Sequence, residues 1–178
     1  MKCLATLLCL SVFTVPAFSQ SENSKDSTLE IEGASLVLGM SKAQVFSELS
    51  NANLLISEAI TNKSWFICSP IANNCNPPLG SFTLKDDQLI MITKRWAGDS
   101  GSVSDLLTAL YGAVAALEAR EMSQCRIKTK QEIEPTKDIR HILLTCSPHI
   151  QLDISLIKTP GGPFRNMIEE IVNLKPEE

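Results

Sequence analysis

Four cysteines are the residues whose type and number most clearly predict chemistry. The chain contains six cysteines, and two of them, Cys3 and Cys9, lie in an N-terminal segment that we expect to be removed. The other four are Cys68, Cys75, Cys125 and Cys146. An even number of cysteines in an exported chain predicts two disulfides. Three pairings are open, and spacing alone does not choose among them.

Local composition favours a bond between the first two of these cysteines. The stretch from Cys68 to Cys75, with two prolines soon after it, is rich in Pro and Asn and is typical of a loop. Such a loop can bring its ends together, so we predict a Cys68–Cys75 disulfide. The closed loop would be stiff and exposed, which makes Asn73 and Asn74 candidate contacts with a partner.

A hairpin favours the second bond. Strand-like residues flank a turn at residues 134–138. An antiparallel register with Cys125 opposite Cys146 also sets Ile127 opposite Leu144, on the same face as the cysteines. That face also receives Thr129 and Ile142. We therefore predict a Cys125–Cys146 disulfide on a strand face that is turned toward the core.

Three basic residues alternate along the first strand of this hairpin. Arg126, Lys128 and Lys130 share its other face, and the same register brings His141 opposite Lys130. A basic strip can meet an acidic partner, and a simply solvated strand face has the same pattern. We favour the solvated face and keep these four residues as candidate partner contacts.

No catalytic or metal site is predicted. Residues 98–101, Gly-Asp-Ser-Gly, match the run around the nucleophile of chymotrypsin-like serine proteases. A nucleophilic serine needs a base held by a third group, and that family carries its histidine upstream, whereas His141 and His149 lie downstream here. Two histidines without further ligand spacing are a weak metal signal. No glycine-rich phosphate-binding motif occurs, so we expect no cofactor and no enzyme activity.

The N-terminus reads as a secretory signal peptide over residues 1–19. Lys2 supplies the positive start, residues 4–15 are apolar but too few to span a bilayer, and Ala-Phe-Ser at 17–19 resembles a cleavage site. A flexible lead-in is expected over residues 20–28. No later stretch is long and apolar enough for stable membrane insertion.

The strongest local structural signal is a helix start. Ser41 and Gln44 have the spacing of a capping box, in which each side chain bonds the other residue's backbone N–H. Met40 and Val45 are placed as a hydrophobic staple across that cap. Gly39 gives the chain freedom for a tight turn before the helix.

The same stretch carries a resemblance. Residues 38–45, Leu-Gly-Met-Ser-Lys-Ala-Gln-Val, resemble the helix-initiating motif L-G-M-[ST]-x-x-[QE]-V of two groups of small bacterial envelope proteins. These are the SmpA/OmlA-like lipoproteins of the outer-membrane barrel-assembly machinery and the β-lactamase-inhibitor-protein-like domains. The resemblance covers residues 36–96 and implies a domain that binds another protein. Cys9 follows Leu8 rather than a small residue, which departs from the lipidated members.

A second helix is expected after Ser102, which is placed to cap it. Large apolar residues repeat along it at helical spacing: Val103, Leu106, Leu107, Leu110, Val114 and Leu117. Its other side is built from small residues: Ala109, Gly112, Ala113 and Ala116. Small residues let a neighbouring element approach closely, and we favour packing within the domain over a partner site.

The order of elements predicts an α+β fold made of two units, each a helix followed by antiparallel strands, with the helices packed on the sheet. The first hairpin should pair residues 82–84 with 89–92, Leu84 opposite Leu89 and Phe82 opposite Met91. Residues 164–172 suit a helix or a returning strand, and we choose strand. We expect one domain over residues 29–178 with halves 29–97 and 98–178; duplication stays open.

Composition narrows the function further. A formal net charge of −4 without a strong basic block argues against nucleic-acid binding. We therefore expect a periplasmic or secreted, non-enzymatic domain of the bacterial cell envelope that binds another envelope or secreted protein. The alternatives are a secreted enzyme of unrecognised class and a structural or stress-related envelope protein. A deep pocket with convergent polar groups would favour the enzyme.

Overall fold

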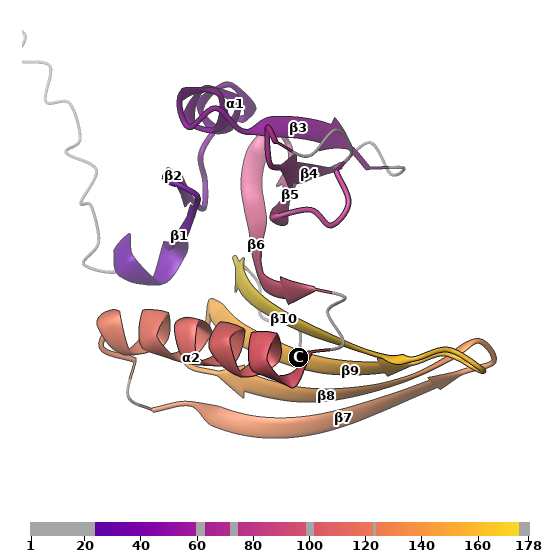
Figure 1. Cartoon of the computed structure of the whole chain (residues 1–178). Helices are drawn as coiled ribbons and strands as arrows, with labels where there is room; N and C mark the ends of the chain where they lie inside the picture. Colours follow the sequence, from indigo (N-terminus) through magenta and orange to yellow (C-terminus); the bar gives the residue numbers. More distant parts are fainter. Residues whose placement is uncertain (1–23, 60–62, 72–74, 99–101, 123, 175–178) are drawn as a thin grey trace, which may run out of the picture.

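The computed structural model describes residues 24–59, 63–71, 75–98, 102–122 and 124–174 (Figure 1). The expected signal peptide lies outside the described residues, and so do Asn73 and Asn74. Within the described ranges, no helix is both long enough and apolar enough to cross a membrane.

The described chain contains ten strands, two α-helices and one 3₁₀ turn. In chain order they are η1 (Ser24–Ser27), β1 (Thr28–Ile31), β2 (Ala34–Val37), α1 (Lys42–Asn51), β3 (Leu55–Glu58), β4 (Ser64–Cys68), β5 (Gly80–Lys85), β6 (Gln88–Gly98), α2 (Val103–Ala119), β7 (Arg126–Glu134), β8 (Lys137–Thr145), β9 (Ile150–Lys158) and β10 (Phe164–Asn173). The last residues of the expected flexible lead-in, from Ser24 onward, therefore have regular structure.

Eight of these strands form one antiparallel sheet in the order β3-β4-β5-β6-β10-β9-β8-β7. Strand β10 joins strands β3–β6 to strands β7–β9, because it pairs with β9 on one side and with β6 on the other. The expected α+β fold of two helix-and-strand units is therefore wrong: the protein is mostly β, with its long strands in a single sheet. Alternating residues locate strands but do not say which distant strand lies beside them.

Residues 164–172 are strand, as chosen from the sequence. Both neighbours of β10 are antiparallel to it, and alternate side chains along it are buried, including Ile168 and Val172. The sequence alone could not identify β6 as its second neighbour, because that pairing joins segments far apart in the chain.

Both helices lie on the same face of the sheet. Phe46 of α1 contacts the rings of Trp65 and Phe82. Phe82 pairs with Ile92 of β6, and Ile92 pairs with Val172 of β10, so these three side chains lie on the same face of the sheet. Helix α2 approaches the same face of β6 through Gly112, which lies against Trp96. One core cluster joins the helices, the β1–β2 hairpin and this face.

Helix α1 begins where the sequence predicts. Ser41 Oγ accepts from the Gln44 N–H at 3.4 Å, and Gln44 Oε1 accepts from the Ser41 N–H at 2.8 Å. Both arms of the capping box are present. Met40 packs against the core cluster that contains the buried Val45. The local prediction is confirmed because capping depends on neighbouring residues alone.

The β5–β6 hairpin is tighter than expected. Leu84 pairs with Leu89, as predicted, but Lys85 also pairs with Gln88, so the turn has two residues rather than four. Asp86 and Asp87 both have positive φ, as such a turn requires. A register shift after Thr83 sets Phe82 opposite Ile92, so the predicted Phe82–Met91 pair is wrong.

Both predicted disulfides are present. Cys68 bonds Cys75, and Cys125 bonds Cys146 across the β7–β8 hairpin. The predicted register is confirmed, with Ile127 opposite Leu144. The prediction that this whole face lies in the core is wrong, because Ile127 is 69% exposed. Helix α2 covers the inner strands of the sheet and leaves β7 at an open edge (Figure 1).

Candidate functional site

Helix α2 meets the sheet through its small residues. Ser102 caps it, its Oγ accepting from the Asp105 N–H. Ala109, Ala113 and Leu117 are buried, and Gly112 lies against the Trp96 ring. The expected packing of the small-residue side within the domain is confirmed.

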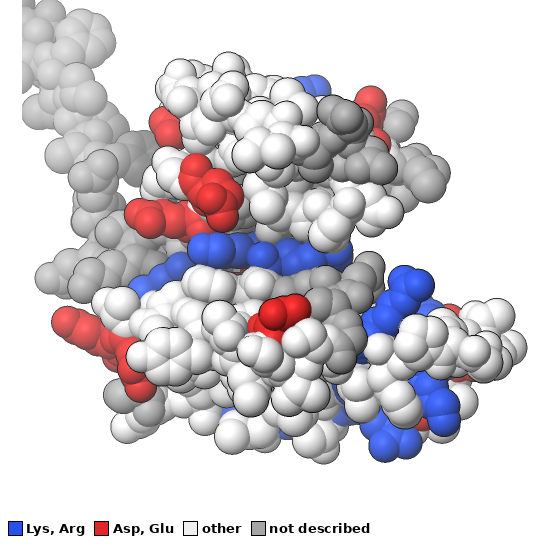
Figure 2. Space-filling view, in the orientation of Figure 1, with Lys and Arg blue, Asp and Glu red and all other residues white. Residues whose placement is uncertain are grey.

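Four larger apolar residues of α2 face solvent, whereas Leu106, Leu110 and Leu117 pack against the core. Val103, Leu107 and Tyr111 are 68%, 58% and 78% exposed, and Val114 is 37% exposed. Their spacing of four, four and three residues places them in one row along the helix. We call these four residues the α2 stripe. Figure 2 shows the surface over α2 largely without Lys, Arg, Asp or Glu.

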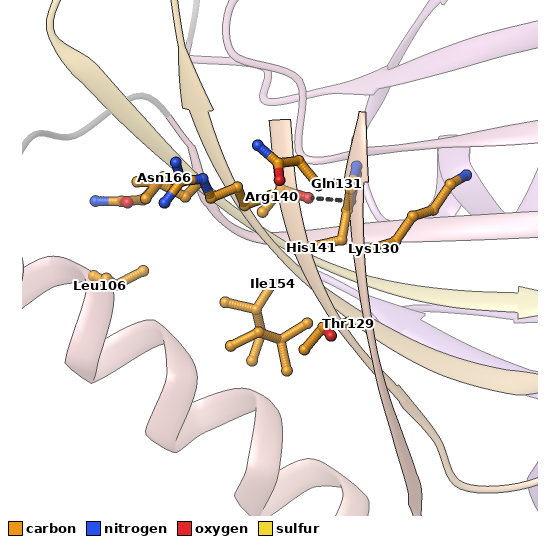
Figure 3. Close-up of a pocket in the computed structure, with 11 residues that line it drawn as sticks. Leu106, Thr129, Lys130, Gln131, Arg140, His141, Ile154 and Asn166 are labelled. Atoms are coloured by element: carbon orange, nitrogen blue, oxygen red, sulfur yellow. Dashed lines mark hydrogen bonds between the residues drawn. The ribbon is translucent and has the colours of Figure 1, made fainter. Parts of the chain in front are cut away.

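A groove opens beside the first half of α2, between the helix and the sheet. We call it the α2 groove; its volume is about 730 Å³. Leu106 forms its helix side, and Ile154 lies on its sheet side (Figure 3). Ile142 and Leu156 also line the groove. The register places these three on the helix-covered face, since Ile142 pairs with Ile154 and Arg140 pairs with Leu156.

Polar side chains stand at one end of the α2 groove. Gln131, Arg140 and Asn166 lie together at that end in Figure 3. Gln131 Nε2 donates to Asp138 Oδ1 at 2.9 Å, and Arg140 Nη2 lies 3.5 Å from Asp138 Oδ2. Asp138 therefore engages two of these groups, and the groove combines an apolar floor with an internally bonded polar end.

A smaller hollow lies under the second half of α2. Its volume is about 370 Å³, and Val114, Leu117, Met122 and Leu144 are among its lining residues. Val114 belongs to the α2 stripe as well, so the stripe and the hollow border each other. The apolar surface thus extends along the helix and onto the sheet on this side.

A buried ionic cluster holds the end of α2 to the sheet. The fully buried Glu170 accepts from Trp96 Nε1 at 3.2 Å, and its Oε1 lies 2.7 Å from Arg120 Nη1 at the helix C-terminus. Lys94 pairs with Glu170 in the register, and its Nζ lies 4.0 Å from the Trp96 ring centroid. Burial lowers the pKa of Lys94, against an opposing effect of Glu170.

His141, Asp153 and Ser155 form a second polar cluster. Strand alternation turns these side chains to the face opposite α2. His141 Nδ1 lies 3.1 Å from both Asp153 oxygens and 3.0 Å from Ser155 Oγ, which donates to Asp153. In a catalytic triad the serine and the aspartate contact different ring nitrogens. Here Nε2 is buried without a partner among the described residues.

The predicted basic strip is only half of a longer pattern. Arg126, Lys128 and Lys130 share one face of β7, and Lys130 lies opposite His141, as predicted. The same face continues with Glu132 and Glu134. Lys130 Nζ lies 2.7 Å from Glu132 Oε1, and this hydrogen bond lowers the pKa of Glu132. The strip therefore has a positive half and a negative half.

Sequence reasoning missed the α2 stripe. The signal was present, because α2 is apolar on two sides, and a surface helix of a globular domain normally has one polar side. What the sequence could not decide was which apolar side turns inward. The bulky Trp96 decides it, because only a small residue fits against its ring.

No group of three or more His, Cys, Asp or Glu side chains in the described part of the chain is arranged to hold a metal. No family model, curated protein or solved structure matches the chain.

Proposed function

We propose that the protein is an exported, non-enzymatic binding domain of the bacterial cell envelope that binds another protein through the surface beside α2. The observation that carries this proposal is the α2 stripe. A contiguous row of exposed apolar side chains on a folded domain marks an interaction site. Its member Tyr111 is 78% exposed and belongs to a residue type enriched at protein interfaces.

A protein partner fits this surface better than a small ligand alone. Next to the α2 stripe, Leu106 of the same helix lines the α2 groove, and the sheet side of the groove includes the exposed Ile142. A small molecule in the groove would leave Leu107 and Tyr111 in water, because neither residue lines it. A partner that inserts an apolar side chain into the groove can cover both with its flanks.

The polar groups favour binding over catalysis. Gln131 and Arg140 at the polar end of the groove are bonded to Asp138, so the groove is mainly an apolar recess rather than a set of convergent reactive groups. The His141 cluster places Ser155 and Asp153 on the same ring nitrogen, and Ser155 is 2% exposed. A substrate would have to displace that packing to reach the hydroxyl.

Two further observations support the compartment. Two disulfides fit an oxidising environment, such as the periplasm or the extracellular medium. The confirmed helix start contains the run that resembles small bacterial envelope proteins. The partner is therefore sought among envelope and secreted proteins, and nucleic acid is not proposed.

A capture experiment with matched variants tests the proposal. Mature protein is immobilised and exposed to periplasmic extract and to culture supernatant, beside the variant Leu107→Ser/Tyr111→Ser. The control is Leu55→Ser/Ile71→Ser, which removes two exposed apolar side chains from the other half. We expect one protein to be retained by wild type and control and lost by the stripe variant. Equal retention by both folded variants would contradict the proposed surface.

A further inference from the structure

Strand β7 presents an open edge of the sheet. It pairs with β8 on one side, and no strand of the described chain pairs with its other side. The β7–β8 register runs without a shift over nine residue pairs, and β7 contains no proline. Folds blunt such an edge with a short strand, charged side chains, a bulge or a proline, and of these β7 has the charges alone. The opposite edge has a short strand, since β3 spans only Leu55–Glu58.

The charges of β7 are sorted along the strand. Positions on one face read Arg126, Lys128, Lys130, Glu132 and Glu134, and the intervening positions read Ile127, Thr129, Gln131 and Ile133. A solvated edge needs charge but has no need for this order. The order matters when β7 is paired antiparallel with a second β7, because the positive half of each strand then lies opposite the negative half of the other.

We propose that two copies of this protein associate through their β7 strands, antiparallel and centred on Lys130, into one continuous sheet. In this register Arg126 faces Glu134 of the second copy, and Lys128 faces Glu132 of the second copy. Each such pair occurs twice about the two-fold axis. Only the central Lys130 faces a like charge, and each Lys130 keeps its own Glu132 at 2.7 Å.

The other face of β7 is matched in the same register. Ile127 faces Ile133 of the second copy, and these side chains are 69% and 77% exposed in the single chain. Thr129 faces Gln131 of the second copy. The dimer therefore covers the two most exposed apolar residues of the C-terminal strands, which α2 leaves bare, and supplies hydrogen-bond partners for the open edge.

Other arrangements fit less well. Parallel pairing in register sets arginine against arginine and glutamate against glutamate. A slip of two residues one way brings Lys128 opposite Lys130. The opposite slip keeps unlike charges together but moves Ile127 beyond the end of the partner strand. The centred register is the one that pairs all nine residues of β7.

The dimer adds to the proposed function without depending on it. Thr129 and Gln131 line the α2 groove, so pairing at β7 sets two grooves side by side across the two-fold axis. The α2 stripe remains uncovered. Loss of partner capture in the stripe variant and loss of the dimer in β7 variants are thus separate results.

Charge reversal tests the dimer directly. Mature protein is measured by sedimentation from about 1 µM to about 1 mM, because a strand-edge contact is small and should bind in the micromolar range. Arg126→Glu/Lys128→Glu and Glu132→Lys/Glu134→Lys should each weaken self-association at least about tenfold. Mixing the two variants should restore a one-to-one dimer, which also shows that both are folded. Lys63→Glu/Lys85→Glu, in the other half, is the charge-matched control.

A cysteine substitution tests the register. Residues on a two-fold axis between antiparallel strands are close enough for a disulfide. Lys130→Cys should therefore form a covalent dimer on oxidation, and Gln131→Cys should not. Three results would overturn the proposal. The wild-type protein could stay monomeric at the highest concentration, the reversal variants could dimerise as wild type does, or the folded variants could fail to pair when mixed.

Discussion

Gly112 of α2 lies directly against the indole ring of Trp96, and a Cβ built on Gly112 would come 3.2 Å from ring atom Cζ3. The ring cannot move away freely, because its Nε1 donates to the buried Glu170. Gly112→Val should therefore lower the free energy of unfolding by about 1–3 kcal/mol through overpacking. Gly112→Ala should stay close to wild type, because a gain of about 1 kcal/mol in helix propensity offsets the tight contact.

Chemical denaturation followed by circular dichroism measures both variants. The control is Tyr111→Val, which places the same β-branched residue on the exposed side of the same helix and should change stability by only about 0.5 kcal/mol. A Gly112→Val protein as stable as wild type would mean that α2 does not approach Trp96 this closely.

Ser41→Ala should lower the free energy of unfolding by about 1 kcal/mol. The substitution leaves the Gln44 N–H without its side-chain acceptor and removes one arm of the capping box. Ser50→Ala, at an exposed position within the same helix, is the control and should be neutral or slightly stabilising, because alanine has the higher helix propensity. Equal effects at the two positions in thermal unfolding would show that the cap contributes nothing.

The sequence was sufficient for two features that depend on neighbours in the chain. The Ser41 cap and the Cys125–Cys146 hairpin register follow from side-chain chemistry and from alternation. The Phe82–Met91 pair failed because a register shift within a strand leaves no clear sequence mark.

Long-range features were beyond the same reasoning. Whether β10 pairs with β6 depends on packing between segments far apart in the chain, and that pairing turns two expected units into one sheet. The orientation of α2 likewise depends on Trp96, which the helix sequence does not contain. The candidate site was missed for this reason: the sequence shows that Leu107 is apolar, but contacts elsewhere in the fold decide that its side chain faces solvent.

The two disulfides should contribute unequally to stability. Cys125–Cys146 closes a separation of 21 residues and Cys68–Cys75 one of 7. In the chain-entropy account the longer loop restricts the unfolded chain more, by about 1 kcal/mol. Replacing Cys125 and Cys146 by serine should therefore cost about 3 kcal/mol and leave the fold intact, and the matching Cys68 and Cys75 double variant should cost less.

Urea denaturation of the two double-serine variants under the same conditions makes the comparison. Far-ultraviolet circular dichroism before denaturation checks that each variant has kept its sheet. A larger loss from the Cys68 and Cys75 variant would show that native contacts around the short loop, rather than loop length, dominate its effect.

Lys94 should make the protein more stable as the pH rises toward 10.5, the ordinary pKa of lysine. Burial, together with the positive charge of Arg120, lowers its pKa in the folded protein, and the opposing attraction of Glu170 only partly offsets this. Between the lowered pKa and the ordinary one, the unfolded chain binds more protons than the folded chain, so stability increases with pH. Below the lowered pKa the cost of burying the charge is present in full.

Lys94→Met removes this dependence, so the melting temperature of wild type minus that of Lys94→Met should increase between pH 7 and pH 10. Lys85→Met, an exposed lysine of the β5–β6 hairpin, is the control for loss of one positive charge. A difference that stays flat or falls over this range would mean that the Lys94 ammonium is not desolvated in the folded protein.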